Sequence, residues 1–233
     1  TRSSWVRSSI AKALPSLLRF IMRVAVLVSG RGSNLRAICA AIDAGSCDAS
    51  IVGVVSDRSK AAALAFAEER GIATRRVPLR KGDDRDAWNE LLAETVANLG
   101  ADLVVLAGFM RVLGPPLLRR FPGRIINVHP ALLPSFPGHN GAQDALEGGV
   151  RISGCTVHVV DAGVDTGPII AQAAVPVLDD DDAESLHTRI QTQEHRLLPA
   201  VIHQIAIGSI TLDPLVVRTP VADPSRSLTV PDA

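Results

Sequence analysis

The sequence predicts an α/β protein built on an open, mostly parallel, twisted β-sheet with helices on both faces. Runs rich in Val, Ile and Leu alternate along the chain with segments whose apolar residues recur at helical spacing. Such alternation is typical of parallel sheets, because a helix normally returns the chain between two parallel strands. Residues suited to chemistry gather in the loops between these segments. This placement fits the fold, since ligands of such sheets bind beyond the carboxyl ends of the strands.

The expected strands are short, β-branched apolar runs. Residues 23–28 form the first, and residues 102–106 form the most apolar, which we therefore expect near the centre of the sheet. The fifth run ends at Pro130, which has no backbone N–H to donate. In order, strands are expected at residues 23–28, 50–56, 74–78, 102–106, 124–129, 153–160 and 169–177.

The expected helices carry apolar residues three or four positions apart. In the first, Leu35, Ile38 and Ile42 share one face, and the second stops at Gly71. The third opens with acidic residues, which suit a helix N-terminus, and stops before Gly100. In order, helices are expected at residues 34–44, 59–70, 84–98, 115–120, 143–147 and 183–205.

Composition narrows the class of protein. The 233 residues are 47% hydrophobic and 21% charged with a net charge of zero, which excludes a disordered chain and a strongly basic nucleic-acid binder. Aromatic residues make up only 3%, too few for a base-stacking single-strand binder. Three cysteines without C-x-x-C spacing suit a reducing compartment, and no apolar run reaches the roughly 18 residues of a membrane span. We therefore expect a soluble, cytoplasmic protein without nucleic-acid or membrane partners.

The two ends of the chain differ from the middle. Residues 1–21 contain arginines and serines but no acidic residue, which resembles a transit segment. An upstream extension is the favoured interpretation, because Met22 directly precedes the first strand. We predict that residues 1–21 lie outside the fold, that residues 22–207 form one domain, and that residues 208–233 form a loosely packed, proline-containing tail.

The turn between the first strand and the first helix reads Ser-Gly-Arg-Gly-Ser-Asn-Leu over residues 29–35. Its glycines let backbone N–H groups approach an anion, the helix start adds a favourable dipole, and Ser33 and Asn34 add side-chain donors. A dinucleotide site requires a third glycine where Leu35 stands, although Asp57 after the second strand leaves NAD open. The turn therefore fits a single phosphate better than a pyrophosphate, and a tight turn without a ligand remains the alternative.

The end of the fifth strand reads Asn-Val-His-Pro over residues 127–130. Residues two apart in a strand share a face, so the Asn127 amide and the His129 imidazole point to the same side. An amide beside an imidazole can stabilise an oxyanion and move protons near neutral pH. The alternative is a hydrogen-bonded histidine that closes a strand. The position at the carboxyl edge of the sheet, before a Pro- and Gly-rich loop, favours catalysis.

A loop rich in Asp and Gly spans residues 161–168. Such composition is common in ordinary turns. If the loop folds over His129, a carboxylate from it would raise the pKa of the imidazole. His158, on the preceding strand, fits a supporting or core position better than a catalytic one.

The last helix carries Gln191 and Glu194 three positions apart, hence on one face. They could bind sugar hydroxyls or form an ordinary polar surface. The acidic run at residues 179–182 suits a helix cap, and no Cys or His group has metal-ligand spacing, so no metal is expected.

Taken together, these segments resemble the folate-dependent phosphoribosylglycinamide formyltransferases, from residue 22 to about residue 207. The resemblance rests on several ordered matches, which are far more specific together than alone. They are S-G-R-G-S-N-L at residues 29–35, L-A-G-F-M-R-V-L at 106–113, N-V-H-P-A-L-L-P-S-F-P-G at 127–138, V-D-T-G-P at 164–168 and Q-T-Q-E-H at 191–195.

The resemblance implies a Rossmann-like formyltransferase fold and direct transfer of a formyl group from 10-formyltetrahydrofolate to the amine of glycinamide ribonucleotide in purine synthesis. It implies that Asn127 and His129 are the catalytic pair and that Asp165 tunes the histidine. It implies that the nucleotide substrate is bound by Gly32, Ser33, Asn34, Gln191 and Glu194. It implies that the folate is bound by Arg85, Met110, Arg111, Val112, Leu113 and Asn127. The partners would be small molecules only, and the chain a monomer or homodimer.

Other functions stay open at this point. A formyltetrahydrofolate hydrolase would use the same chemistry with water as acceptor, but such enzymes carry an N-terminal regulatory domain, for which residues 1–21 are too few. Methionyl-tRNA formyltransferase is another alternative, but it needs a further C-terminal domain, and only a short tail follows the last expected helix here. A non-catalytic nucleotide-binding module would explain the glycine-rich turn but leaves Asn127, His129 and Asp165 without a role. His139 departs from the pattern usual after F-P-G, so it is assigned no role.

Overall fold

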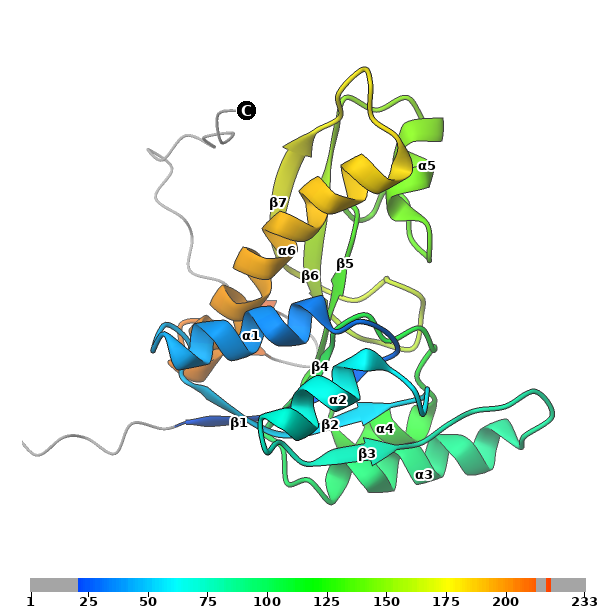
Figure 1. Ribbon diagram of the computed structural model, residues 1–233, viewed down its shortest axis with the longest axis vertical. Coiled ribbons are helices and arrows are strands. Elements are labelled where there is room, and N and C mark those ends of the chain that lie inside the picture. The colour runs from blue at the N-terminus through cyan, green and yellow to red at the C-terminus, as the bar shows by residue number, and fades with distance from the viewer. Residues whose placement is uncertain (1–20, 213–216, 219–233) are drawn as a thin grey trace, which may run out of the picture.

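The computed structural model describes residues 21–212 and 217–218. Its core is a seven-stranded sheet in the order β3-β2-β1-β4-β5-β6-β7 (Figure 1). The strands β1 to β5 pair in parallel, whereas β6 and β7 run antiparallel to their neighbours. The strands are β1 (Met22–Val28), β2 (Ala49–Ser56), β3 (Thr74–Arg76), β4 (Leu103–Leu106), β5 (Ile125–His129), β6 (Ile152–Val159) and β7 (Ile169–Pro176). The predicted open, mostly parallel sheet is confirmed.

Helices cover both faces of this sheet, as predicted. One apolar cluster packs α1, α2, α5 and α6 on one face, and a second packs α3 and α4 on the other. The strand β1 serves both, because Val24 and Val26 face the first cluster while Ala25 and Leu27 face the second. The helices are α1 (Ser33–Asp43), α2 (Ala62–Glu69), α3 (Arg85–Ala97), α4 (Pro115–Arg120), α5 (Gly141–Glu147) and α6 (Ala183–Ala206).

The structure confirms every predicted strand and helix up to residue 206 and corrects several boundaries. The central strand is β4, as its apolar sequence predicted. The strand β3 ends at Arg76 instead of residue 78, because its pairing with β2 stops at Ser56 and Pro78 has no N–H to extend it. The helix α2 begins at Ala62 instead of residue 59, after a turn that no side chain caps.

The tail prediction needs a correction. Residues Thr211–Leu212 form β8, which pairs antiparallel with β9 (Val217–Arg218). Ile210 is buried in the apolar cluster beneath α6, and Leu212 packs against it, so the first tail residues belong to the core. The rest of the tail and residues 1–20 lie outside the described residues. Over the described part of the chain, no helix is long and apolar enough to cross a bilayer.

The antiparallel half of the sheet positions the loop that was predicted to approach His129. In the β5–β6 pair, Asn127 lies opposite His158 and His129 opposite Thr156. The strand β6 therefore ends beside the beginning of β5, and the loop at residues 160–168 has to turn back before β7 starts. Within this loop, Asp165 lies 3.3 Å from His129, the last residue of β5, so the loop reaches the carboxyl end of that strand.

Candidate active site

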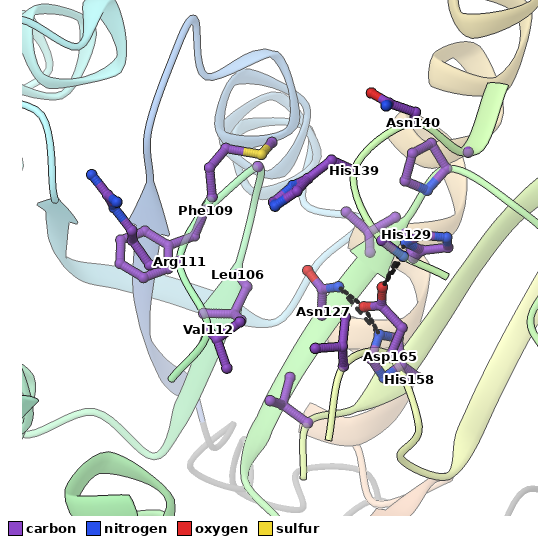
Figure 2. Close-up of a pocket in the computed structure, with 18 of the residues that line it drawn as sticks. Leu106, Phe109, Arg111, Val112, Asn127, His129, His139, Asn140, His158 and Asp165 are labelled. Atoms are coloured by element: carbon purple, nitrogen blue, oxygen red, sulfur yellow. Dashed lines mark hydrogen bonds and ion pairs between the residues drawn. The ribbon is translucent and has the colours of Figure 1, made fainter. Parts of the chain in front are cut away.

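A cavity of about 570 Å³ lies at the carboxyl ends of β4 and β5 (Figure 2). The segment after β4 forms one wall, β5 forms the floor, and the loop at residues 160–168 forms the opposite wall. The N-terminal turns of α6 and the start of α5 close the remaining side. Its lining includes Leu106, Met110, Val112, Asn127, His129 and Asp165.

Asp165 is the residue on which the polar side chains of the cavity converge (Figure 2). One carboxylate oxygen, Oδ2, lies 3.3 Å from His129 Nδ1 and accepts a 2.9 Å hydrogen bond from the backbone N–H of Gly138. The other, Oδ1, lies 3.4 Å from Asn127 Nδ2 and 3.5 Å from His158 Nε2. Asp165 has a positive φ of 55°, a conformation that non-glycine residues rarely adopt outside sites where the surroundings hold them. The structure thus brings Asn127, His129 and Asp165 together.

The electrostatics of the cluster follow from this geometry. Burial raises the pKa of Asp165, but the adjacent His158 imidazole, the hydrogen bond from the Gly138 N–H and the charge of His129 together outweigh burial and lower it. Burial lowers the pKa of His129, and it outweighs the opposing effects of Asp165 and the Phe136 carbonyl. The predicted effect of the carboxylate is present, but the net direction for His129 is the reverse of the prediction. The imidazole is therefore mostly neutral at pH 7 in the free protein.

Hydrogen-bond partners indicate how Asn127 is oriented. His158 Nδ1 lies 2.9 Å from the Val159 carbonyl, which only accepts, so we assign the proton of a neutral His158 to Nδ1. Its Nε2 then accepts from Asn127 Nδ2 at 3.1 Å. Both N–H groups of the Asn127 amide are directed to protein atoms, and the amide oxygen faces the open side of the cavity (Figure 2).

A second polar cluster joins the glycine-rich turn to α6. The Gln191 amide donates to Ser33 Oγ at 3.0 Å, and Asn34 Nδ2 donates to Glu194 at 2.9 Å. Asn34 Oδ1 is buried and has no hydrogen-bond partner among the described residues. The N-terminus of α1 has no side-chain cap, so its first N–H groups are not satisfied by a cap. The predicted nucleotide-binding residues therefore lie together, beside the cavity rather than on its wall.

The second glycine of the turn has a structural reason to be glycine. Gly32 has a φ of 78°, and a Cβ placed on it would lie 2.6 Å from the Ala63 Cβ in α2. A Cβ on Gly30, by contrast, would meet nothing within 4 Å. The absence of a side chain at Gly30 therefore leaves open space at the turn, whereas its absence at Gly32 allows the turn to pack against α2.

Glu194 is buried, with 4% of its surface exposed. Burial raises the pKa of its carboxyl, and the hydrogen bond from Asn34 opposes this only in part. The two clusters thus hold carboxyl groups whose pKa values are shifted in opposite directions.

The segment predicted to bind folate forms one wall of the cavity. Met110 and Val112 are about half exposed, whereas Leu113 is buried. Arg85, at the start of α3, donates to the Val112 carbonyl and stacks over the Trp88 ring at 4.6 Å, and it does not line the cavity. The Arg111 guanidinium is directed away from Asn127 and His129 (Figure 2). In this structure Arg85 contacts the Val112 carbonyl, and Arg111 Nε donates to the Asp57 carboxylate.

Sequence reasoning missed other residues of the site. His187 lines the cavity and lies four residues before Gln191, so one face of α6 serves both clusters. The spacing of four residues between His187 and Gln191 could have indicated this shared face from the sequence. His158, which was expected in a supporting or core position, contacts both Asn127 and Asp165, and only the β5–β6 register could show these partners. His139 and Asn140 also line the cavity.

The sequence and the fold that surround this cavity match a known class of enzyme. The family model described as "Formyl transferase" matches residues 22–202, and the chain belongs to that family. Within it, several similar proteins are named phosphoribosylglycinamide formyltransferase.

Phosphoribosylglycinamide formyltransferase of Mycobacterium tuberculosis is 50% identical over 190 residues, which cover 82% of this chain and 87% of the relative. The enzyme of the same name from Escherichia coli is 39% identical over 191 residues, which cover 82% and 90%. The crystal structure of glycinamide ribonucleotide transformylase 1 from Symbiobacterium toebii superposes with a TM-score of 0.82 at 44% identity, covering 86% of this chain and 94% of that one.

Proposed function

We propose that this formyltransferase moves a formyl group from 10-formyltetrahydrofolate to the amine of glycinamide ribonucleotide, a step of de novo purine synthesis. The names of its relatives support this choice of substrates, and the cavity offers room for one reactant beside a second polar cluster for the other. We place the reaction in the cytoplasm, in a domain that begins at residue 22 and extends to at least Leu212.

The folate would bind along the wall after β4. Met110, Val112 and Leu113 supply apolar surface and backbone groups to the reduced pterin, a mixture that small-molecule sites commonly use. Asn127 would meet the formyl end. In the free protein, Arg85 and Arg111 contact other protein groups, so we assign both to the support of this wall rather than to direct contact with the ring.

The nucleotide would bind at the glycine-rich turn. The uncapped start of α1, with Gly32 and Ser33, suits a phosphate monoester, because N–H groups and the helix dipole both favour an anion. Asn34 Oδ1, an unpartnered acceptor, suits a donor such as a ribose hydroxyl or the glycinamide amide. Gln191 and Glu194 would hold the same end of the substrate from α6.

The reaction would be direct acyl transfer. The amine nitrogen attacks the formyl carbon, the carbonyl electrons move to oxygen, and the C–N bond to folate breaks as a proton passes from the attacking to the departing nitrogen. Binding both reactants in one site supplies proximity without a covalent intermediate on the protein.

Asn127 and His129 would stabilise the oxyanion of the tetrahedral intermediate. The 3.4 Å contact from Asn127 to Asp165 is at the outer limit of a hydrogen bond, so this N–H is the one available to turn toward the oxyanion. Negative charge beside His129 opposes the burial that lowers its pKa in the free protein. The imidazole can therefore take the proton that leaves the attacking amine and pass it to the departing folate nitrogen.

The observation that carries this proposal is the convergence of Asn127 and His129 on Asp165 at the cavity floor. The test is formyl release from 10-formyltetrahydrofolate by the purified chain, measured with and without glycinamide ribonucleotide. We expect release only when the amine is present. Release that ignores the amine would favour a hydrolase, and no release in either case would favour a non-catalytic binding module.

A further inference from the structure

A buried carboxylate outside the proposed chemistry lies behind the folate wall. Asp57 follows β2, and its side chain has no exposed surface. Its Oδ1 accepts a 2.5 Å hydrogen bond from the Ser29 hydroxyl, and its Oδ2 accepts one of 2.8 Å from Arg111 Nε. A buried carboxylate is costly unless it is paired and hydrogen-bonded, and here both oxygens are. With both oxygens bound and no surface exposed, Asp57 does not fit the ribose-binding role that a dinucleotide site would require.

The two partners of Asp57 hold the same segment from two sides. Ser29 Oγ, which donates to Asp57, also accepts the backbone N–H of Met110 at 2.9 Å. The Ser29 N–H donates to the Gly108 carbonyl at 3.0 Å. Arg111 belongs to the segment itself and reaches back to Asp57, with a second contact of 3.4 Å to the Leu79 carbonyl. Asp57 therefore fixes consecutive residues of the wall, Met110 through its backbone and Arg111 through its side chain.

This fixation has a consequence for recognition. The Met110 and Val112 side chains are about half exposed and make no buried anchor, so packing alone does not define the wall at these positions. A binding site that uses backbone N–H and C=O groups depends on their position, because an unfixed segment would lose conformational entropy on binding. Arg111 lines the cavity, but its guanidinium pairs with Asp57 and is directed away from Asn127 and His129 (Figure 2).

We propose that Asp57 is a positioning residue for the folate. It acts through Arg111 and Ser29 to hold the backbone of residues 110–113 in its binding geometry. The inference rests on the proposed function, since it assumes that this wall binds folate.

The test compares Asp57→Asn with the wild type in two measurements, steady-state kinetics with both substrates and calorimetric binding of tetrahydrofolate. Asparagine keeps the shape and can still accept from Ser29, but it loses the charge that pairs with Arg111. We expect the Kd for tetrahydrofolate and the KM for 10-formyltetrahydrofolate to rise about tenfold or more, as for a lost charged hydrogen bond, while kcat changes less than about threefold.

A double-mutant cycle separates positioning from general destabilisation. In an Arg111→Gln background, the folate effect of Asp57→Asn should largely disappear, because the two residues act as one unit. The matched control is Asp102→Asn, which breaks the ion pair with Arg23 at the amino-terminal edge of the same sheet. It should lower the melting temperature but leave the Kd for tetrahydrofolate unchanged.

Several outcomes would overturn the proposal. Wild-type folate affinity in Asp57→Asn, or equal folate effects in Asp57→Asn and Asp102→Asn, would reduce Asp57 to a structural role. Tighter folate binding would mean that a freed Arg111 contacts the ligand directly. If Asp57→Asn does not fold, Arg111→Gln and Ser29→Ala test the same connection, and unchanged KM values in both would reject it. If the wild type itself fails to bind tetrahydrofolate, the proposed function fails instead.

Discussion

The two polar clusters each contain one carboxyl group, and the pKa values of these two groups are shifted in opposite directions. Asp165 receives a backbone N–H and an asparagine amide and faces two imidazoles, and its pKa is lowered. Glu194 is more deeply buried and receives one amide hydrogen bond, and its pKa is raised. The number of hydrogen-bond donors and the depth of burial, not the identity of the acid, set the direction of each pKa shift.

The two carboxyl groups are suited to two different kinds of chemistry. A carboxylate that stays ionised can orient an imidazole and stabilise its charged form. A carboxyl group with a raised pKa places less negative charge near an anion that binds at the adjacent helix start. A raised pKa of Glu194 would therefore suit the phosphate binding that we propose at the glycine-rich turn.

The largest effect expected from breaking the first cluster is on turnover. His129→Ala and Asp165→Ala should each lower kcat by about 10²-fold to 10⁴-fold, because they remove the proton-transfer group or the carboxylate that orients it. Steady-state formyl transfer and circular dichroism on each purified variant check this. The control is His203→Ala, which removes an imidazole near Asp48, remote from the cavity. Near wild-type turnover in either cluster variant would reject the assignment.

The second cluster depends on backbone shape, which two matched glycine substitutions can test. Gly32→Ala should lower the free energy of unfolding by about 1–3 kcal/mol, because the residue has a positive φ and its Cβ would collide with Ala63. Gly30→Ala should change it by less than about 0.5 kcal/mol, since its Cβ would enter open space. Urea denaturation measures both, and equal losses would contradict this account of the turn.

The opposite pKa shifts predict opposite pH dependences of stability. The lowered pKa of Asp165 gives stability that is present above its unfolded value of 3.8 and is lost as the pH falls through the folded value. The raised pKa of Glu194 gives stability that is present below its unfolded value of 4.5 and is lost as the pH rises through the folded value. Asp165→Asn should therefore be least stable relative to wild type at neutral pH, whereas Glu194→Gln should gain relative to wild type as the pH rises.

Urea denaturation from about pH 3 to about pH 8 follows both differences. Parallel curves for the two variants would mean that the carboxyl groups are equivalent after all.

The smallest expected effect concerns His129 alone. Its pKa should lie below 6.5 in the free protein and should fall further in Asp165→Asn, because burial remains while the opposing carboxylate is removed. Imidazole NMR signals followed against pH measure both values. A pKa above 6.5 in the wild type would show that Asp165 outweighs burial and would restore the direction that the sequence alone suggested.

The sheet was predictable from local patterns, and the errors lie where tertiary packing decides. Apolar runs and helical spacing placed the strands and helices up to residue 206, and the apolar content of residues 102–106 placed the central strand. The start of the tail was missed because Ile210 and Leu212 pack against a cluster drawn from distant segments. No local pattern reveals such packing.

The site was predictable in its residue types but not in its electrostatics. Strand alternation placed Asn127 and His129 on one side, and the family resemblance pointed to Asp165. The net pKa direction of His129 depends on burial, which a sequence does not state, and the contacts of Arg85 and Arg111 depend on partners far away in the chain. Asp57 was considered only for a cofactor that the structure does not suit, because its pairing with Arg111 spans 54 positions.

The helix α6 supplies His187 to the cavity and Gln191 and Glu194 to the glycine-rich turn from one continuous element. An α-helix rises about 1.5 Å and rotates about 100° per residue, so α6 fixes both the distance and the relative direction of the side chains that it supplies to the cavity and to the turn. One residue inserted between His187 and Gln191 would swing one set of side chains off the shared face. Length variation should therefore be tolerated in the loops that flank this helix and rejected within its first three turns.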